Sequence, residues 1–251
     1  MKLSTIITDL KNFDPHIYSK HKVGIEVQTF GQDKLDTDYQ PLIIEWASKL
    51  KNFNEPISLH GSSFDLNPGS TDKKIIEVTR QRYLQSIDIA KKIGVKNIVF
   101  HSQVNPLLSV QHIRELKVNN QIEFWIDLFK NYIPKDINIL LENEYDDTPE
   151  DIGKIVRTVN KENFGICFDT GHCLAYSSYG LEDWVKTIGD LIKYVHLHWN
   201  DGQADQHRKP LDHDFCQFKT LMTKYNISPI VTLEYKVEDL SCEIKRLKSL
   251  I

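Results

Sequence analysis

The sequence predicts a (β/α)8 barrel, the TIM-barrel class of α/β fold, from three observations. Apolar runs of strand length alternate with segments of helical periodicity along the 251 residues, and about 250 residues is the usual length of such a barrel. The runs are continuously apolar, as expected for parallel strands buried on both faces. No Pro-, Gly- or Ser-rich linker interrupts them, so we expect a single domain over residues 1–251.

Eight strands are expected from the apolar runs, which are rich in the β-branched and aliphatic residues that favour extended backbone. In chain order they cover Leu3–Ile7, Val23–Val27, Ile57–His60, Val95–His101, Ile137–Glu142, Gly165–Asp169, Tyr194–His198 and Ile230–Glu234. Most of these runs finish on a histidine or a carboxylate, the side chains that bind divalent cations.

The segments between the strands carry helix signals. Pro41 suits the first turn of a helix, Thr148-Pro149-Glu150 suits a helix start, and Gly94 suits a helix end. Ser70-Thr71-Asp72 precedes the longest periodic segment. The expected helices cover residues 41–53, Lys73–Ile93, Val118–Tyr132, Asp151–Asn160, Leu181–Gly189, Phe215–Tyr225 and Glu238–Leu250.

Charge, hydropathy and cysteine spacing exclude several classes of protein. The formal net charge of −4 creates no strong attraction to nucleic acid or anionic lipid. No apolar run reaches the ~18–20 residues of a membrane span, and the first residues, MKLSTIITDLKNFD, are too interrupted for a signal peptide. The four cysteines show no CxxC pairing and no disulfide-framework spacing. We therefore expect a cytoplasmic protein with reduced thiols and no membrane contact.

Three carboxylates and a histidine make the sharpest local pattern. Glu142, Asp169 and Glu234 each end an apolar run, where an ionised side chain is costly unless it is paired or metal-bound. In a parallel β/α barrel these strand ends meet on one face. A salt bridge would explain any one carboxylate, but a shared cation is the simpler explanation for all three with His196. His198 shares a face with His196, so either is a candidate ligand.

A second group of candidate ligands lies just beyond the strands. In FDTGH, residues 168–172, Gly171 permits a tight turn that returns His172 to the same mouth. Asp205 and His207 form a D-x-H pair on the loop after the seventh strand, able to hold a metal with His172; an ordinary polar loop is the alternative. His60 and His101 end two further strands.

Four motifs carry a resemblance that runs from GIEV in the second strand to TLEY in the eighth. They are LLEN (140–143), CFDTGH (167–172), HLHWNDGQADQH (196–207) and TLE (232–234). Together they resemble the xylose isomerase-like barrel superfamily, which contains sugar and sugar-phosphate isomerases and epimerases as well as endonuclease IV.

The resemblance implies a ligand set for each branch. In the epimerase branch one divalent ion is held by the residues that match Glu142, Asp169, His196 and Glu234; the two glutamates act as acid and base, and His172 contacts the substrate. In endonuclease IV three zinc ions use five further ligands, which match His60, His101, His172, Asp205 and His207. All nine positions are filled. We therefore expect one to three ions of zinc, manganese, iron or cobalt.

Two segments depart from the pattern. The chain reads HSQV (101–104) where endonuclease IV and many relatives have His-Pro-Gly, and KPLDHDF (209–215) lacks the family's Leu-Gly-x-Gly turn. His213, in that altered turn, is interpreted as a loop residue rather than a further ligand.

Three function classes fit these residues: an isomerase or epimerase of a small sugar, sugar phosphate or polyol, an endonuclease IV-like phosphodiesterase, and a binding protein without catalysis. The loops at the expected mouth are acidic, as in ENEYDD (142–147) and NDGQAD (200–205). A protein that grips DNA needs several cationic phosphate contacts. The first class is therefore favoured, with a carbohydrate substrate, and nucleic acid is disfavoured; self-association into a homo-oligomer is left open.

Two side chains outside the ligand set are candidates for substrate binding. Trp199 lies between polar residues on the loop after the seventh strand and would stack on a substrate, with packing around the mouth as the alternative. Arg208, with Lys209 beside it, would bind a substrate phosphate, although such loop pairs are commonly just solvated.

Overall fold

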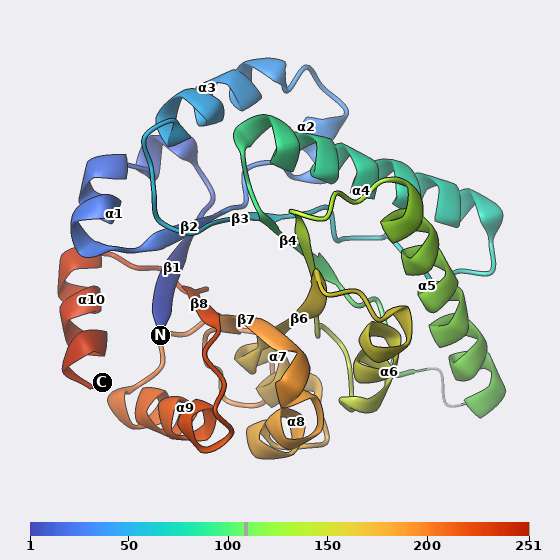
Figure 1. The fold of residues 1–251 in the computed structure, drawn as a ribbon. Helices are drawn as coiled ribbons and strands as arrows, with labels where there is room; N and C mark the ends of the chain where they lie inside the picture. Colours follow the sequence, from blue (N-terminus) through green and yellow to red (C-terminus); the bar gives the residue numbers. More distant parts are fainter. Residues whose placement is uncertain (108–109, 251) are drawn as a thin grey trace.

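The eight predicted strands close into a parallel barrel in chain order, with β8 completing the ring against β1. The computed structural model describes residues 1–107 and 110–250. Figure 1 shows the strands surrounded by the helices. The strands are β1 (Lys2–Ile7), β2 (Gly24–Val27), β3 (Ile57–His60), β4 (Asn97–His101), β5 (Asn138–Glu142), β6 (Phe164–Asp169), β7 (Ile192–Leu197) and β8 (Ile230–Leu233).

The helices cover the outer face of the barrel. Within the described residues, no helix combines the length and the apolar character needed to cross a bilayer. The helices are α1 (Pro15–His21), α2 (Gln32–Leu35), α3 (Gln40–Leu50), α4 (Lys73–Ile93), α5 (Gln111–Asn131), α6 (Glu150–Val159), α7 (Thr170–Tyr176), α8 (Leu181–Ile188), α9 (Asp212–Lys224) and α10 (Leu240–Ser249), with 3-10 turns η1 (Leu10–Asn12) and η2 (Gly189–Leu191).

Helix α4 shows how local sequence sets these boundaries. The Asp72 side chain accepts the backbone N–H of Lys74 and caps the helix start. Gly94 follows the last turn with φ of +77°, a left-handed conformation that favours glycine. Both ends of α4 lie where the sequence predicts them.

Several boundaries differ from the sequence prediction. α1 was not delimited, although Asp14 caps it and Pro15 opens it. α5 begins at Gln111 rather than Val118, because its polar first turns are held by ion pairs and not by an apolar face. Arg114 contacts Asp147 at 2.7 Å and Asp151 at 2.5 Å.

The altered turn before α9 is also helical. α9 begins at Asp212, so His213 lies in its first turn and not in a loop. The His213 side chain is 75% exposed and pairs with the neighbouring Asp214 at 3.1 Å. It is therefore not placed among the candidate ligands.

The barrel interior explains why the candidate ligands meet. Val99, Leu140, Cys167 and Tyr194 form a buried cluster inside the ring of strands. Side chains two residues apart in a strand share a face, so the residues two positions further along point into the same interior, one layer closer to the mouth. Those residues are His101, Glu142, Asp169 and His196, and the register pairs His101 with Glu142 and Asp169 with His196.

Candidate metal centre

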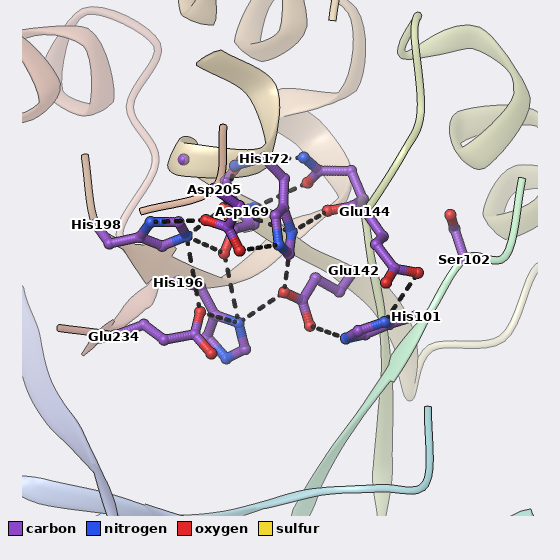
Figure 2. Close-up of polar contacts among 12 residues, drawn as sticks. His101, Ser102, Glu142, Glu144, Asp169, His172, His196, His198, Asp205 and Glu234 are labelled. Atoms are coloured by element: carbon purple, nitrogen blue, oxygen red, sulfur yellow. Dashed lines mark hydrogen bonds and ion pairs between the residues drawn. The ribbon is translucent and has the colours of Figure 1, made fainter. Parts of the chain in front are cut away.

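The C-terminal ends of the strands surround a cavity of about 310 Å³. Most of the candidate ligands line it, while Asp169 and His196 lie beneath its surface and are fully buried. Figure 2 shows side chains from several strands converging on one region, with those of His172 and Asp205 beside them; the strand side chains that it labels include His101, Glu142, Asp169 and His196. The candidate ligands on the cavity wall are His60, His101, Glu142, His172, Asp205, His207 and Glu234.

The four side chains matched to the epimerase ion lie together and are called the central group below. One ligand atom from each of Glu142, Asp169, His196 and Glu234 falls within 4.8 Å of the others. His196 Nδ1 lies 2.9 Å from Glu142 Oε1, 3.0 Å from Glu234 Oε2 and 3.8 Å from Asp169 Oδ2. Buried carboxylates this close repel one another unless a positive charge lies between them.

His60 and His101 flank Glu142 on its other side. Their Nε2 atoms lie 3.5 Å and 3.6 Å from Glu142 Oε2, and the three residues form a second candidate group. Glu142 belongs to both groups, so its two carboxylate oxygens face two different candidate ion positions.

The third group includes His198 in addition to the predicted residues. Asp205 Oδ2 lies 3.4 Å from His172 Nε2 and 2.8 Å from His207 Nε2, so the D-x-H pair and His172 do meet. His198 Nε2 is 3.0 Å from Asp169 Oδ1, and its Nδ1 is 3.5 Å from Asp205 Oδ1. His198 therefore lies between the central group and the D-x-H pair, while His196 lies within the central group.

In most of these histidines, one ring nitrogen contacts a carboxylate or a backbone carbonyl that would orient the ring. In metal sites one ring nitrogen binds the ion while the other contacts a carboxylate or a backbone carbonyl, which fixes the tautomer. The same arrangement recurs at five positions. The contacts are His60 Nδ1 to Gly61 O at 2.9 Å, His101 Nδ1 to Glu144 Oε2 at 3.0 Å, His172 Nδ1 to Asn143 O at 2.9 Å, His196 Nε2 to Glu26 Oε2 at 2.9 Å and His207 Nδ1 to Glu234 O at 2.7 Å.

Polar atoms with poorly formed hydrogen bonds also indicate a cation. Glu142 Oε2, Glu234 Oε2, Asp205 Oδ1 and His198 Nδ1 are buried, and in the described part of the chain none of them makes a hydrogen bond of ordinary geometry; their partners are the histidine–carboxylate pairs given above. Such atoms are costly to bury, and all four belong to the candidate ligands or contact them. The mixture of imidazole and carboxylate groups suits zinc, manganese, iron or cobalt, so the residues fit the predicted metal.

Comparison with known proteins decides the family. A model of the xylose isomerase-like TIM barrel family matches residues 23–250. The chain belongs to the xylose isomerase-like TIM barrel family. It is 28% identical over 179 residues to the uncharacterised protein MJ1311 of Methanocaldococcus jannaschii, a match that covers 67% of this chain and 60% of that protein.

Solved structures of this family resemble the chain over its whole length. A D-tagatose 3-epimerase-like protein has a TM-score of 0.79 at 21% identity, covering 100% of this chain and 97% of that one. The Escherichia coli 3-keto-D-glucoside 4-epimerase YcjR has a TM-score of 0.68 at 16% identity, covering 100% and 98%. Sugar epimerases are thus among the structural neighbours, and at these identities the likeness shows the fold.

The FDTGH segment of this family member is helical rather than a tight turn. Asp169 caps α7, and its side chain accepts the His172 backbone N–H at 2.6 Å. The glycine is needed for space: a Cβ on Gly171 would lie 1.9 Å from Cε1 of His198. The predicted turn is therefore wrong, although His172 does return to the mouth.

Three polar residues of the site escaped the sequence analysis. Glu26 of β2 contacts His196, Gln28 just past β2 contacts Glu234, and Glu144 contacts His101. Glu26 could have been found from the sequence, because it is a charged residue inside the apolar run VGIEV. Gln28 and Glu144 lie just past their strands, where polar residues are common, so nothing local distinguished them.

The structure places Trp199 and Arg208 away from the cavity. They pair through their backbones in an isolated bridge, and neither is among the residues that line the cavity. The Arg208 guanidinium contacts Asp201 at 3.1 Å, and the Lys209 ammonium contacts Glu243. The acidic partners explain why these cations are not directed at the mouth.

Opposite charges determine the protonation of the site. Burial lowers the pKa of His60, but the hydrogen bond to Glu142 and its charge raise it to about 9. The Asp205 hydrogen bond raises the pKa of His207 to about 9. Burial raises the pKa of Glu142, yet the charges of His196 and His101 hold it well below its usual range. Protons on the histidines thus balance the carboxylates, and an incoming cation must displace them.

We predict that Gly171→Ala destabilises the protein. Alanine normally favours a helix over glycine, but here the added methyl overlaps His198, and overpacking typically costs about 1–3 kcal/mol. Thermal unfolding should show a lower Tm. Gly180→Ala is the matched control, because its nearest neighbour would be 3.9 Å away. Equal Tm values for the two variants would contradict the packing argument.

We also predict that Mn²⁺ affinity rises between about pH 6.5 and pH 9, because His60 and His207, with pKa values of about 9, must lose their protons to bind. These pKa values lie above the ordinary histidine value of 6.5. The charged pairs therefore stabilise the metal-free fold fully below pH 6.5, and this contribution is lost as the pH rises through 9.

Calorimetry in two buffers of different ionisation enthalpy measures the proton release that accompanies Mn²⁺ binding. Binding without proton release, and with an affinity independent of pH over this range, would show that the histidines are not ligands.

Proposed function

We propose that this protein is a divalent-metal-dependent isomerase or epimerase of a small unphosphorylated sugar or related polyol. The observation that carries the proposal is the pair formed by Glu142 and Glu234. Both line the cavity, and both place a carboxylate oxygen in the central candidate group. Two carboxylates on one bound sugar can remove a proton from carbon and return it.

The residues divide the chemistry between them. A cation held by Glu142, Asp169, His196 and Glu234 would polarise adjacent hydroxyl and carbonyl oxygens of a sugar. One glutamate takes the proton from the carbon beside the carbonyl. In epimerisation the other returns a proton to the opposite face of that carbon. In isomerisation a proton is returned to the neighbouring carbonyl carbon, while the hydroxyl proton moves to the former carbonyl oxygen. His172, on the cavity wall, is placed to hydrogen-bond a hydroxyl.

The charge of the cavity wall supports an unphosphorylated substrate. Of the described residues that line the cavity, none is lysine or arginine. Arg208 and Lys209, the candidates for a phosphate site, are paired with Asp201 and Glu243 instead. Gln28, Gln32 and Ser63 line the wall and offer the neutral hydrogen-bonding groups that suit hydroxyls.

The remaining predictions belong to the same proposal. The groups around His60 and around Asp205 admit further ions, so the number stays at one to three. Cys167, Cys173, Cys216 and Cys242 are free thiols. The cytoplasmic location stays a prediction from the sequence. The oligomeric state stays open.

An endonuclease IV-like phosphodiesterase is the second candidate, because each of the nine matched residues belongs to at least one of the candidate metal-binding groups at the mouth. Clustered ions activate water and stabilise a leaving oxygen in phosphodiester cleavage. The cavity wall weighs against it, since DNA binding needs lysine or arginine at phosphates.

Deuterium exchange tests the proposed reaction. With Mn²⁺ at saturation in D2O, a panel of ketoses should include one that gains deuterium beside its carbonyl, detected by NMR. Glu234→Gln should slow this exchange by about 10²-fold or more, as expected for loss of a general base. Phosphorylated ketoses should exchange more slowly than the free sugars.

Glu243→Gln provides the matched control. Glu243 is a buried carboxylate in α10 whose partners are Lys209, Arg246 and Tyr235, so this variant should exchange at the wild-type rate. Cleavage of abasic-site DNA without exchange on any sugar would overturn the isomerase in favour of the phosphodiesterase.

A further inference from the structure

Glu26 is a buried carboxylate inside the barrel, on β2. It has no exposed surface, and it is not among the residues that line the cavity. Substrate therefore cannot reach it. In the described part of the chain its side-chain contacts are with His196, whose Nε2 lies 2.9 Å from Oε2, and with Gln28, whose Nε2 donates to Oε1 at 2.9 Å.

This placement is energetically unfavourable for a merely structural residue. A buried carboxylate is costly unless it is paired and hydrogen-bonded, and an apolar residue would fill a barrel interior more cheaply. The two partners of Glu26 both lead to the candidate metal centre. His196 Nδ1 faces Glu142 and Glu234, and Gln28 Nε2 also donates to Glu234 Oε1 at 3.3 Å.

We propose that Glu26 is a positioning residue that fixes the tautomer of His196 and, through Gln28, the orientation of Glu234. By accepting the His196 Nε2–H, the Glu26 carboxylate leaves the Nδ1 lone pair directed at the central group. A carboxylate behind a ligating imidazole also raises its basicity. The inference rests on the proposed function, because it presupposes a cation in the central group.

Glu26 differs from the other four groups that contact a ring nitrogen of a site histidine. His60, His172 and His207 are held by backbone carbonyls, which no side-chain substitution removes. His101 is held by Glu144, which lines the cavity and is therefore open to substrate. Glu26 alone among these five contacts is a side chain inaccessible from the mouth, so substituting it changes the positioning without removing a substrate contact.

The test compares metal binding by wild type, Glu26→Gln and the control Glu243→Gln. Mn²⁺ dissociation constants come from competition with a chromophoric chelator, and the visible spectrum of the Co²⁺ form reports the ligand geometry. Glu26→Gln should bind Mn²⁺ about 10–100-fold more weakly and shift the Co²⁺ bands. Glu243→Gln removes a buried carboxylate elsewhere and should change neither.

A double-mutant cycle with His196→Asn tests whether Glu26→Gln lowers the Mn²⁺ affinity through His196. If Glu26 acts through His196, most of the loss in Glu26→Gln should disappear in the His196→Asn background. An equal loss in both backgrounds, or an unchanged affinity and spectrum in Glu26→Gln, would overturn the role of Glu26 while leaving the metal centre intact. Failure of wild type itself to bind Mn²⁺, Co²⁺ or Zn²⁺ would overturn the proposed function and this inference together.

Discussion

The need to balance buried negative charge dominates this structure. Glu26, Glu142 and Asp169 are fully or almost fully buried at one end of the barrel, and Glu234 lies beside them. Carboxylates in a low-dielectric interior strongly disfavour one another's ionisation. In the metal-free chain, protonated histidines placed between them supply the compensating charge. A cation in the same position would supply it more compactly and release those protons.

The fold creates this concentration of charge through a simple periodicity. Apolar side chains fill the barrel interior up to the level of Leu140 and Cys167. Two residues further along the same two strands, on the same face, are Glu142 and Asp169. The apolar layer closes the barrel beneath the site and lowers the local dielectric, while the surrounding helices hold the strand ends in place. Function and stability thus use the same strands, one layer apart.

Much of the fold could be predicted because buried parallel strands leave continuous apolar runs. The barrel, its strand order and both ends of α4 follow from such local signals. α1 and the first turns of α5 were missed because polar contacts stabilise them; Arg114, bound to Asp147 and Asp151, leaves no apolar periodicity to detect.

The candidate site was partly predictable for the same reason. Carboxylates and histidines at or just past the ends of apolar runs stand out, and the nine candidates lie around one mouth. The contribution of Glu26 depends on a contact 170 positions away in the chain, which no local pattern records. The need for Gly171 likewise comes from the His198 ring and not from a turn. Arg208 looked available in the sequence because its partner, Asp201, is brought near only by the folded loop.

The most direct test of the central claim is a crystal structure of the protein grown with Zn²⁺, with anomalous data collected at the zinc edge. We predict a peak in the central group, with oxygens of Glu142, Asp169 and Glu234 at about 2.0–2.2 Å and an imidazole nitrogen at about 2.0–2.1 Å. Carboxylates that remain paired with histidines, with no anomalous peak between them, would contradict the claim that this barrel is built around a metal.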